Sequence, residues 1–416
     1  MRASDPFEDL DVDQGKAVLL TALSILLAIV YAFLFPTQAA VVAVILSFFL
    51  IIMLHETGHF VAAKRAGMKV TEFFVGFGPR LWSFRRGETE YGIKAVPLGG
   101  YCRIIGMTSV EDVALEDEPR AYRAKPWHSK VVVAGAGPAV HFVLATILMF
   151  TVLFLAGDFR NASVTTTLGG VAQGAQAAGL QPGDRVVSIN GTKITSWSQV
   201  PALINPPNEP AKAGSVVAIE VVRGGVDKVV HVTLNASSDP NANGRVVAGI
   251  SPHQYLPHPG LVESVVKAPR QVAEVTWDSV KALGSMFSPA GISNYFHILA
   301  GDKSKNVDQN KRFVSPAGFG KLATDAVQSG WVNVLRLLIA INVFVGLFNL
   351  LPLLPFDGGH IAIATYERLA SAVRGRRVQV DVAKLMPLTL VVVAVFGFIA
   401  LSSLFLDVTR PISNPF

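Results

Sequence analysis

The chain has 416 residues and is poor in both cysteine and charge. Its single cysteine, Cys102, excludes an intrachain disulfide and a zinc site made of cysteines. Charged residues make up 16% of the sequence, whereas a soluble domain has about 25%. Hydrophobic residues make up 51%, so we expect much of the chain to lie in lipid. Any bound metal is then expected to have histidine and carboxylate ligands.

The net charge of +6 does not indicate a nucleic-acid-binding protein. The basic residues are scattered among apolar segments and form no patch interleaved with aromatic residues. We therefore expect no nucleic-acid partner, and we interpret the basic residues as signals of membrane topology.

Five segments are apolar enough and long enough, or nearly so, to cross about 30 Å of hydrocarbon. The first follows an acidic leader and ends at Pro36-Thr37-Gln38, which does not resemble a cleavage site, so we expect it to remain as a helix. The five segments are Ala17–Phe35, Ala39–Ala63, Val131–Leu155, Trp331–Leu350 and Leu385–Leu406.

The loops between these segments differ in charge. Basic residues concentrate in Lys64–Lys130 and in the connection that follows Trp331–Leu350. By the positive-inside rule, both connections are expected in the cytoplasm. Five crossings then place the amino terminus in the cytoplasm and Gly157–Gly330 outside the cell membrane.

The pentapeptide His55-Glu56-Thr57-Gly58-His59 follows an uncharged apolar run. Histidines four apart lie on one face of a helix, so both imidazoles can reach one metal. Glu56, between them, can contact a water bound to that metal. Alone, this pattern could equally mark a solvated helix end. At membrane depth, however, three ionisable groups are costly to desolvate, which favours a metal site.

A second polar constellation lies some 300 residues downstream. Asn342 and Asn349 share one face of an apolar helix, which Pro352 and Pro355 then break. Asp357-Gly358-Gly359 follows the break; alone it would indicate a surface turn. A catalytic zinc commonly has three protein ligands, so Asp357 could complete the histidine pair, with His360 as the rival ligand.

Together, these motifs resemble the two signatures of the site-2 protease family of intramembrane metalloproteases. The bacterial branch that cleaves anti-sigma factors is the most similar, and its actinobacterial members especially so. The resemblance covers nearly the whole chain. It includes the segments Gly76-Phe77-Gly78-Pro79 and Pro97-Leu98-Gly99-Gly100-Tyr101 of a membrane-associated β-hairpin, and Gly135-Ala136-Gly137-Pro138 at the start of the next span.

The resemblance implies a role for each motif residue. Zn²⁺ would be held by His55, His59 and Asp357. Glu56 would act as general base, and Asn349 would position the scissile peptide or its oxyanion. The residues expected at the substrate are Gly76, Gly78, Gly99, Gly100 and Asn342.

This sequence departs from the family pattern at His141-Phe142, where relatives have Asn-Phe or Asn-Leu soon after the Gly-Pro pair. A hydrogen-bonding position has become a titratable one. His141 could be a buried donor, an auxiliary neighbour of the metal, or a neutral replacement. The helix Ala17–Phe35 is a further departure, because it precedes the family's usual four spans.

The segment between the two motifs contains a pattern typical of a PDZ core. Residues 178–191 combine a helix end, a Gly-Asp turn, an alternating strand and Asn190-Gly191 for a tight reversal. Val216–Val222 and Val229–Leu234 predict further strands, giving a domain of roughly Leu168–Asn235. It could capture an extended chain or only obstruct access. The following stretch, Val262–Met286, predicts an amphipathic helix.

The predicted fold is a polytopic α-helical membrane protein with about five transmembrane helices, a membrane-associated β-hairpin and one inserted extracytoplasmic PDZ-like domain. The expected divisions are an acidic leader and extra helix (1–38), the first part of the catalytic membrane core (39–156), the PDZ-like domain (157–255), an amphipathic helix and linker (256–330) and the second part of the core (331–416).

The predicted function is intramembrane zinc endopeptidase in the bacterial plasma membrane, with the active site toward the cytoplasm. The expected substrates are single-span regulatory proteins such as anti-sigma factors, already shortened by a site-1-type protease. The alternative is a non-catalytic PDZ-bearing receptor or chaperone with a vestigial metal site. A transporter is disfavoured because the sequence lacks inverted-repeat symmetry.

Overall fold

The computed structural model describes residues 30, 34–107, 111–206, 211–236, 246–302, 304, 308 and 312–411. The predicted helix Ala17–Phe35 lies almost wholly outside them. The chain divides into two compact units, one formed by Met1–Val152 with Val265–Phe416 and the other by Leu153–Ser264.

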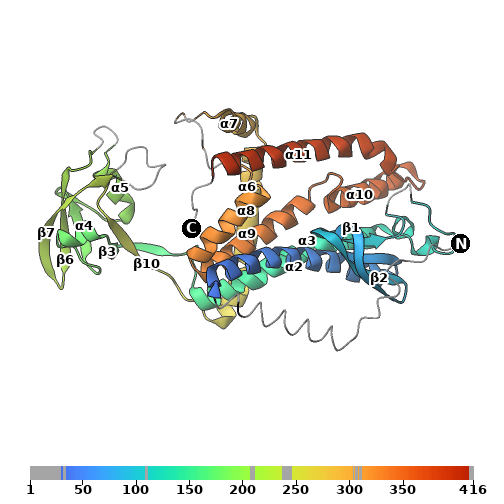
Figure 1. Cartoon of the computed structure of the whole chain (residues 1–416), viewed down its shortest axis with the longest axis horizontal. Helices are drawn as coiled ribbons and strands as arrows, with labels where there is room; N and C mark the ends of the chain where they lie inside the picture. The colour runs from blue at the N-terminus through green and yellow to red at the C-terminus, as the bar shows by residue number, and fades with distance from the viewer. Residues whose placement is uncertain are drawn as a thin grey trace. The chain divides into compact units, whose positions relative to one another are not determined.

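Four helices in the described part of the chain are long and apolar enough to cross a membrane, and they coincide with four of the predicted spans (Figure 1). Their apolar side chains point outward as well as inward, as on Leu46 and Leu50, which are about 60% exposed. Such surfaces suit lipid contact. The helices are α2 (Pro36–Arg65), α3 (Trp127–Ala156), α9 (Trp331–Asn349) and α11 (Met386–Thr409), the last extended by the 3₁₀ turn η4 (Val382–Leu385).

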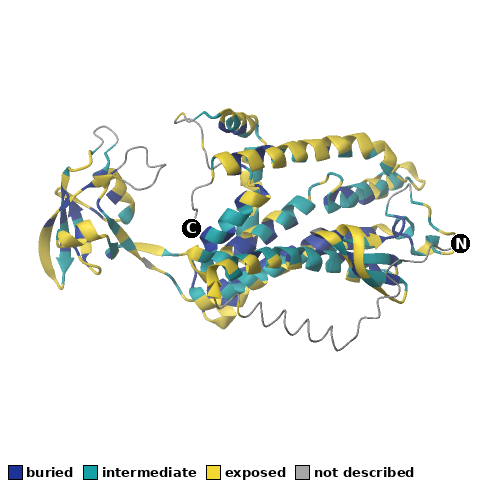
Figure 2. Cartoon of the chain, in the orientation of Figure 1, coloured by how far each residue is buried: buried dark blue, intermediate teal, exposed yellow. Residues whose placement is uncertain are grey.

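The remaining helices of this unit include the predicted amphipathic helix, which is confirmed as α6. Figure 2 shows that α11 is exposed along most of its length, with buried positions near its end. There the Asp407 carboxylate pairs with Arg312 at 3.0 Å and accepts the backbone N–H of Ser315 at 2.7 Å. The helices are α6 (Leu261–Met286), α7 (Pro289–Ala300), α8 (Pro316–Gln328) and α10 (Asp357–Arg374), with 3₁₀ turns η1 (Glu118–Arg120) and η2 (Tyr122–Ala124).

Helices α2 and α3 meet at their backbones. A Cβ atom on Gly58 of α2 would lie 2.6 Å from the carbonyl oxygen of Ala136 on α3. Small residues at a crossing let membrane helices pack this closely, because dispersion contacts then replace the lost lipid contacts.

The predicted hairpin is confirmed as the antiparallel strands β1 (Val70–Arg86) and β2 (Thr89–Ile104). The start of β1 pairs with β2 on both of its edges, as Phe73 does with Tyr91 and Cys102. It packs against α2. A Cβ atom on Gly100 of β2 would lie 3.0 Å from Met53 Sδ and 3.4 Å from Glu56 Cγ. The hairpin therefore borders the helix that carries the first motif.

The Asp-Gly-Gly sequence, which alone would indicate a surface turn, begins a helix instead. Asp357, Gly358 and Gly359 form the first turn of α10, and neither glycine has a positive φ. Their role is close approach, because a Cβ atom on Gly358 would lie 2.3 Å from the carbonyl oxygens of Leu350 and Leu351. The break itself is confirmed, since α9 ends at Asn349.

The unit Leu153–Ser264 contains an antiparallel sheet of order β10-β3-β4-β6-β7, with β5 paired to β4. The predicted reversal is present, because Asn190 and Gly191 both have positive φ (51° and 77°). The elements are β3 (Ser163–Val171), α4 (Gln173–Ala177), β4 (Arg185–Ile189), β5 (Thr192–Lys193), η3 (Trp197–Gln199), α5 (Val200–Ile204), β6 (Val216–Arg223), β7 (Val226–Thr233), β8 (Asn235–Ala236), β9 (Val246–Val247) and β10 (Ile250–Tyr255).

Two features of this sheet bear on peptide capture. Leu168–Val171, which loosely resembles a carboxylate-binding loop, lies within β3 and pairs with β10. A peptide therefore cannot add to this stretch on its β10 side. An ion pair joins the end of β6 to the residue before β4. The Arg223 guanidinium donates two hydrogen bonds of 2.6 and 2.7 Å to the buried Asp184.

This pair predicts a pH-dependent stability for the unit. Hydrogen bonds from Arg223 hold the pKa of Asp184 below its ordinary value. A depressed pKa stabilises the fold at neutral pH, and this contribution is lost as the pH falls through the folded-state value. We expect Arg223→Met to lower the urea concentration at which the backbone amides of β4 and β6 lose half of their protection from hydrogen exchange at pH 7. This difference in urea midpoint between variant and wild type should shrink as the pH falls. A gap that is independent of pH would contradict this.

Candidate metal centre

Three side chains from two distant helices converge at one point in the first unit. His55 and His59 lie one turn apart on α2, and their Nε2 atoms are 3.1 Å apart. Each Nε2 atom lies 3.3 Å from Asp357 Oδ2 at the start of α10. Both histidines are buried, and the aspartate is nearly so.

This arrangement fits a tetrahedral zinc ion. Zinc–ligand distances of about 2.0–2.1 Å imply ligand atoms roughly 3.3 Å apart, which matches the three spacings. Within the described residues, the buried Asp357 Oδ2 has no hydrogen-bond partner of acceptable geometry. Two imidazoles and a carboxylate form a suitable donor set, with a fourth position left for water.

The second ring nitrogen of His59 is also fixed. Its Nδ1 atom donates to the backbone carbonyl of Val133 on α3, at 2.8 Å. That bond sets the tautomer and leaves the lone pair of Nε2 directed toward Asp357. The helix α3 therefore orients a candidate ligand that it does not itself supply.

Glycine at position 137 makes the site possible sterically. A Cβ atom there would lie 2.3 Å from His59 Nε2 and 2.7 Å from His55 Nε2, so a larger residue would overlap both ring nitrogens. The backbone of α3 thus closes one side of the cluster. We had assigned no role to Gly137, and its only sequence signal was its place in the Gly-Ala-Gly-Pro segment.

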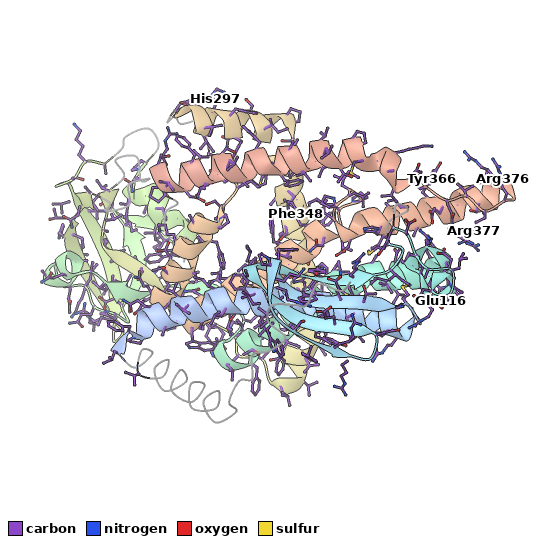
Figure 3. The ribbon with its side chains drawn as sticks, turned by 45° about the vertical axis from the view of Figure 1, so that its right-hand side comes forward. Glu116, His297, Phe348, Tyr366, Arg376 and Arg377 are labelled. Atoms are coloured by element: carbon purple, nitrogen blue, oxygen red, sulfur yellow. The ribbon has the colours of Figure 1, made fainter. Side chains whose placement is uncertain are left out.

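Aromatic packing holds the carboxylate in place. Phe348 of α9, Phe356 just before Asp357, and Phe396 of α11 form a cluster of rings with centroids 5.5–6.1 Å apart. Figure 3 shows Phe348 near the break between α9 and α10. Edge-on aromatic pairs stabilise such contacts by about 0.5–1.5 kcal/mol each, so the start of α10 is held against two membrane helices.

Glu56 lies between the two histidines in sequence and borders the hairpin. Its carboxylate lies close to the backbone N–H of Cys102 on β2. Burial raises the pKa of the Cys102 thiol to about 12, so this sulfur stays protonated and is a poor metal ligand. A carboxylate beside two imidazoles can accept and return a proton at this site.

The other predicted site residues are distributed differently. The His360 ring lies beside Tyr122, with centroids 6.2 Å apart, and lines a small cavity with Lys130 and Glu367. It is not part of the cluster, so the geometry favours Asp357 over His360. Asn349 is half-buried at the end of α9.

The glycines and Asn342 complete the predicted set. Gly76, Gly78 and Gly99 belong to the hairpin and have positive φ values of 84°, 83° and 147°. Gly100 is the hairpin glycine that reaches Glu56. Asn342 is fully buried, and its Oδ1 atom lies 3.1 Å from His141 Nδ1.

Comparison with known proteins places this geometry in context. The model of Peptidase family M50 matches residues 43–395. The chain is similar to "Zinc metalloprotease Rip1" of Mycolicibacterium smegmatis, with 36% identity over 400 residues covering 87% of this chain and 95% of the relative. The protein of that name from Mycobacterium tuberculosis is 33% identical over 404 residues, covering 88% and 95%.

Two further similarities are more distant. A putative zinc metalloprotease of Fusobacterium nucleatum is 29% identical over 318 residues, covering 76% of this chain and 85% of the relative. The solved PDZ domain of an SdrC-like protein from Listeria monocytogenes is 22% identical and covers 22% of this chain and 86% of that one. Its TM-score of 0.18 carries no argument about the fold.

The close approach at position 137 predicts a steric effect on metal binding. We expect Gly137→Ala to weaken zinc binding, because the added methyl group displaces both imidazoles. Overpacking costs about 1–3 kcal/mol, which corresponds to a roughly 5- to 150-fold loss of affinity. Chelator competition would measure it. Gly135→Ala is the matched control, since its Cβ would meet only Ile361 Cδ1, at 3.9 Å.

The identity of the third ligand predicts a second contrast. We expect Asp357→Asn to lose zinc during purification, whereas His360→Ala keeps it, because only Asp357 reaches the two imidazoles. Metal analysis of the purified variants by mass spectrometry would compare them. Full zinc content in Asp357→Asn, or its loss in His360→Ala alone, would refute the assignment.

Proposed function

This chain belongs to Peptidase family M50, and we propose that it is an intramembrane zinc endopeptidase that cuts the transmembrane segments of single-span regulatory proteins. The observation that carries the proposal is the meeting of His55, His59 and Asp357 among apolar helices. Such a cluster of buried polar groups in lipid-facing helices is costly unless it binds something.

We assign the metal to these three side chains. When bound by these residues, zinc would lower the pKa of a coordinated water toward neutrality and so would supply a nucleophile at physiological pH. Glu56 accepts the water's proton and returns it to the departing amine. The nearby N–H of Cys102 and the close approach of Gly100 keep the Glu56 carboxylate oriented for both transfers. Asn349 positions the scissile peptide or its oxyanion.

The hairpin offers a strand edge with which an unwound substrate segment can pair. A membrane-spanning helix has its carbonyls in internal hydrogen bonds, so it must unwind locally before hydrolysis. Within the described residues, β1 and β2 pair only with each other, and the edges left free are those of Arg80–Arg86 in β1 and Gly100–Ile104 in β2. An unwound segment adds to such an edge as a further strand. Gly100 keeps the approach open beside Glu56, and Gly76, Gly78 and Gly99 are the other hairpin glycines that we place at the substrate.

The orientation proposed for the chain places this site toward the cytoplasm. Arg374, Arg376 and Arg377 cluster at the end of α10, as Figure 3 shows for the last two, and positively charged connections remain inside. The unit Leu153–Ser264 would then lie outside the cytoplasm as a PDZ-like domain. There it would exclude substrates that still carry a large ectodomain.

The substrates that we propose lack a large ectodomain, so this domain would not exclude them. We propose anti-sigma factors and similar single-span proteins that an upstream site-1-type protease has already shortened. Cleavage by this chain would then release a cytoplasmic fragment. The vestigial-receptor alternative leaves the intact trio, Glu56 and the Gly137 contact without a reason.

The proposal predicts the effect of removing the base. We expect Glu56→Gln to keep its zinc but to cleave about 10²- to 10⁴-fold more slowly, because a glutamine cannot accept the water's proton. Purified protein would be incubated with a single-span substrate, with and without its ectodomain. Glu116→Gln, at an exposed position, is the control, and the shortened substrate should be cut faster by wild type. Equal cleavage by Glu56→Gln and wild type would exclude the enzyme proposal.

A further inference from the structure

His141 of α3 sits in a chain of hydrogen bonds with a fixed direction. Asn342 of α9 donates from Nδ2 to the carbonyl of Leu338 at 2.8 Å, one turn earlier on the same helix. Its Oδ1 atom faces His141 Nδ1 at 3.1 Å. Because Oδ1 can only accept, His141 Nδ1 must be the donor.

This assignment leaves the other nitrogen of His141 as an acceptor. The side chain is 1% exposed, and burial disfavours a charged ring without a counter-charge. A neutral imidazole with its proton on Nδ1 has a lone pair on Nε2. Within the described residues, that atom is buried and has no hydrogen-bond partner.

His55 has a ring nitrogen that can donate a hydrogen bond but has no acceptor among the described residues. Its Nε2 atom faces Asp357, so a metal held there uses the Nε2 lone pair and leaves the proton on Nδ1. His55 Nδ1 is also buried without a partner in the described part of the chain. The rings of His55 and His141 lie with centroids 5.0 Å apart and are tilted by 44°. A donor without an acceptor thus lies beside an acceptor without a donor.

We propose that His141 is a positioning residue for the metal centre, which accepts a hydrogen bond at Nε2 from His55 Nδ1–H when the metal is bound. The structure itself does not contain this bond, which would form on rotation of the two neighbouring rings. His55 then has an outer partner, as His59 has in the Val133 carbonyl. The chain Leu338–Asn342–His141–His55 links α9 to the metal.

The length of the histidine side chain matters to this role. Its two nitrogens let it serve Asn342 and His55 at once. Asparagine at position 141 places its amide where Nδ1 lies, and glutamine reaches the position of Nε2. The two substitutions therefore each retain a different half of the hydrogen-bond chain.

This contrast provides the test, which rests on the metal centre of the proposed function but needs no substrate. Zinc affinity of the full-length protein in detergent would be measured by chelator competition. We expect His141→Asn to weaken zinc binding by about 10- to 100-fold, the usual effect of losing an outer partner. His141→Gln should bind zinc nearly as tightly as wild type. Thr146→Val, which loses only a bond to the Phe142 carbonyl on the same helix, is the control.

The outcomes separate the possible roles of His141. If His141→Gln loses as much affinity as His141→Asn, or more, the residue serves only to tie α3 to α9 and the proposal is overturned. Equal affinity in wild type and both variants also overturns it, while leaving the metal centre intact. A wild-type protein that binds no zinc would refute the metal centre itself. Gel filtration and thermal unfolding of each variant would identify a misfolded one.

Discussion

The structure depends on the contacts that three polar side chains make with one another inside an apolar helix bundle. The imidazoles of His55 and His59 and the carboxylate of Asp357 have few other partners at this depth. In lipid, groups of this kind are tolerated only when they are paired or bound. The surrounding elements serve that convergence: α3 closes it at Gly137, and the break after Asn349 lets α10 begin at Asp357.

Much of this site was predictable from the sequence, because its parts are local. Histidines four apart share a helix face regardless of tertiary context, so the pair on α2 follows from the motif alone. Apolar runs of about 20 residues likewise predict the spans. The choice of Asp357 over His360 was different, since it depends on which face of α10 turns inward. The motif resemblance favoured Asp357, and the packing of α10 against Tyr122 turns His360 away.

What the sequence could not predict depends on backbone contacts between distant elements. Gly358 and Gly359 suggest a flexible bend, yet they are helical and are needed because Leu350–Leu354 pass so close. The family resemblance implied that Asn342 lies at the substrate. Burial against His141 assigns it to the interior instead. No local pattern distinguishes these cases, because each depends on a neighbour some 200 residues away or on the path of a loop.

The contact between the hairpin and Glu56 has a consequence for inhibition. Gly100 and the N–H of Cys102 belong to the same strand, and both lie close to the glutamate. A compound with an extended backbone that docks on this strand would therefore shift the surroundings of the carboxylate as well as fill space. Such a compound would not need a metal-chelating group. Because the contact is made with the strand and not with the metal, it would favour selectivity over other zinc hydrolases.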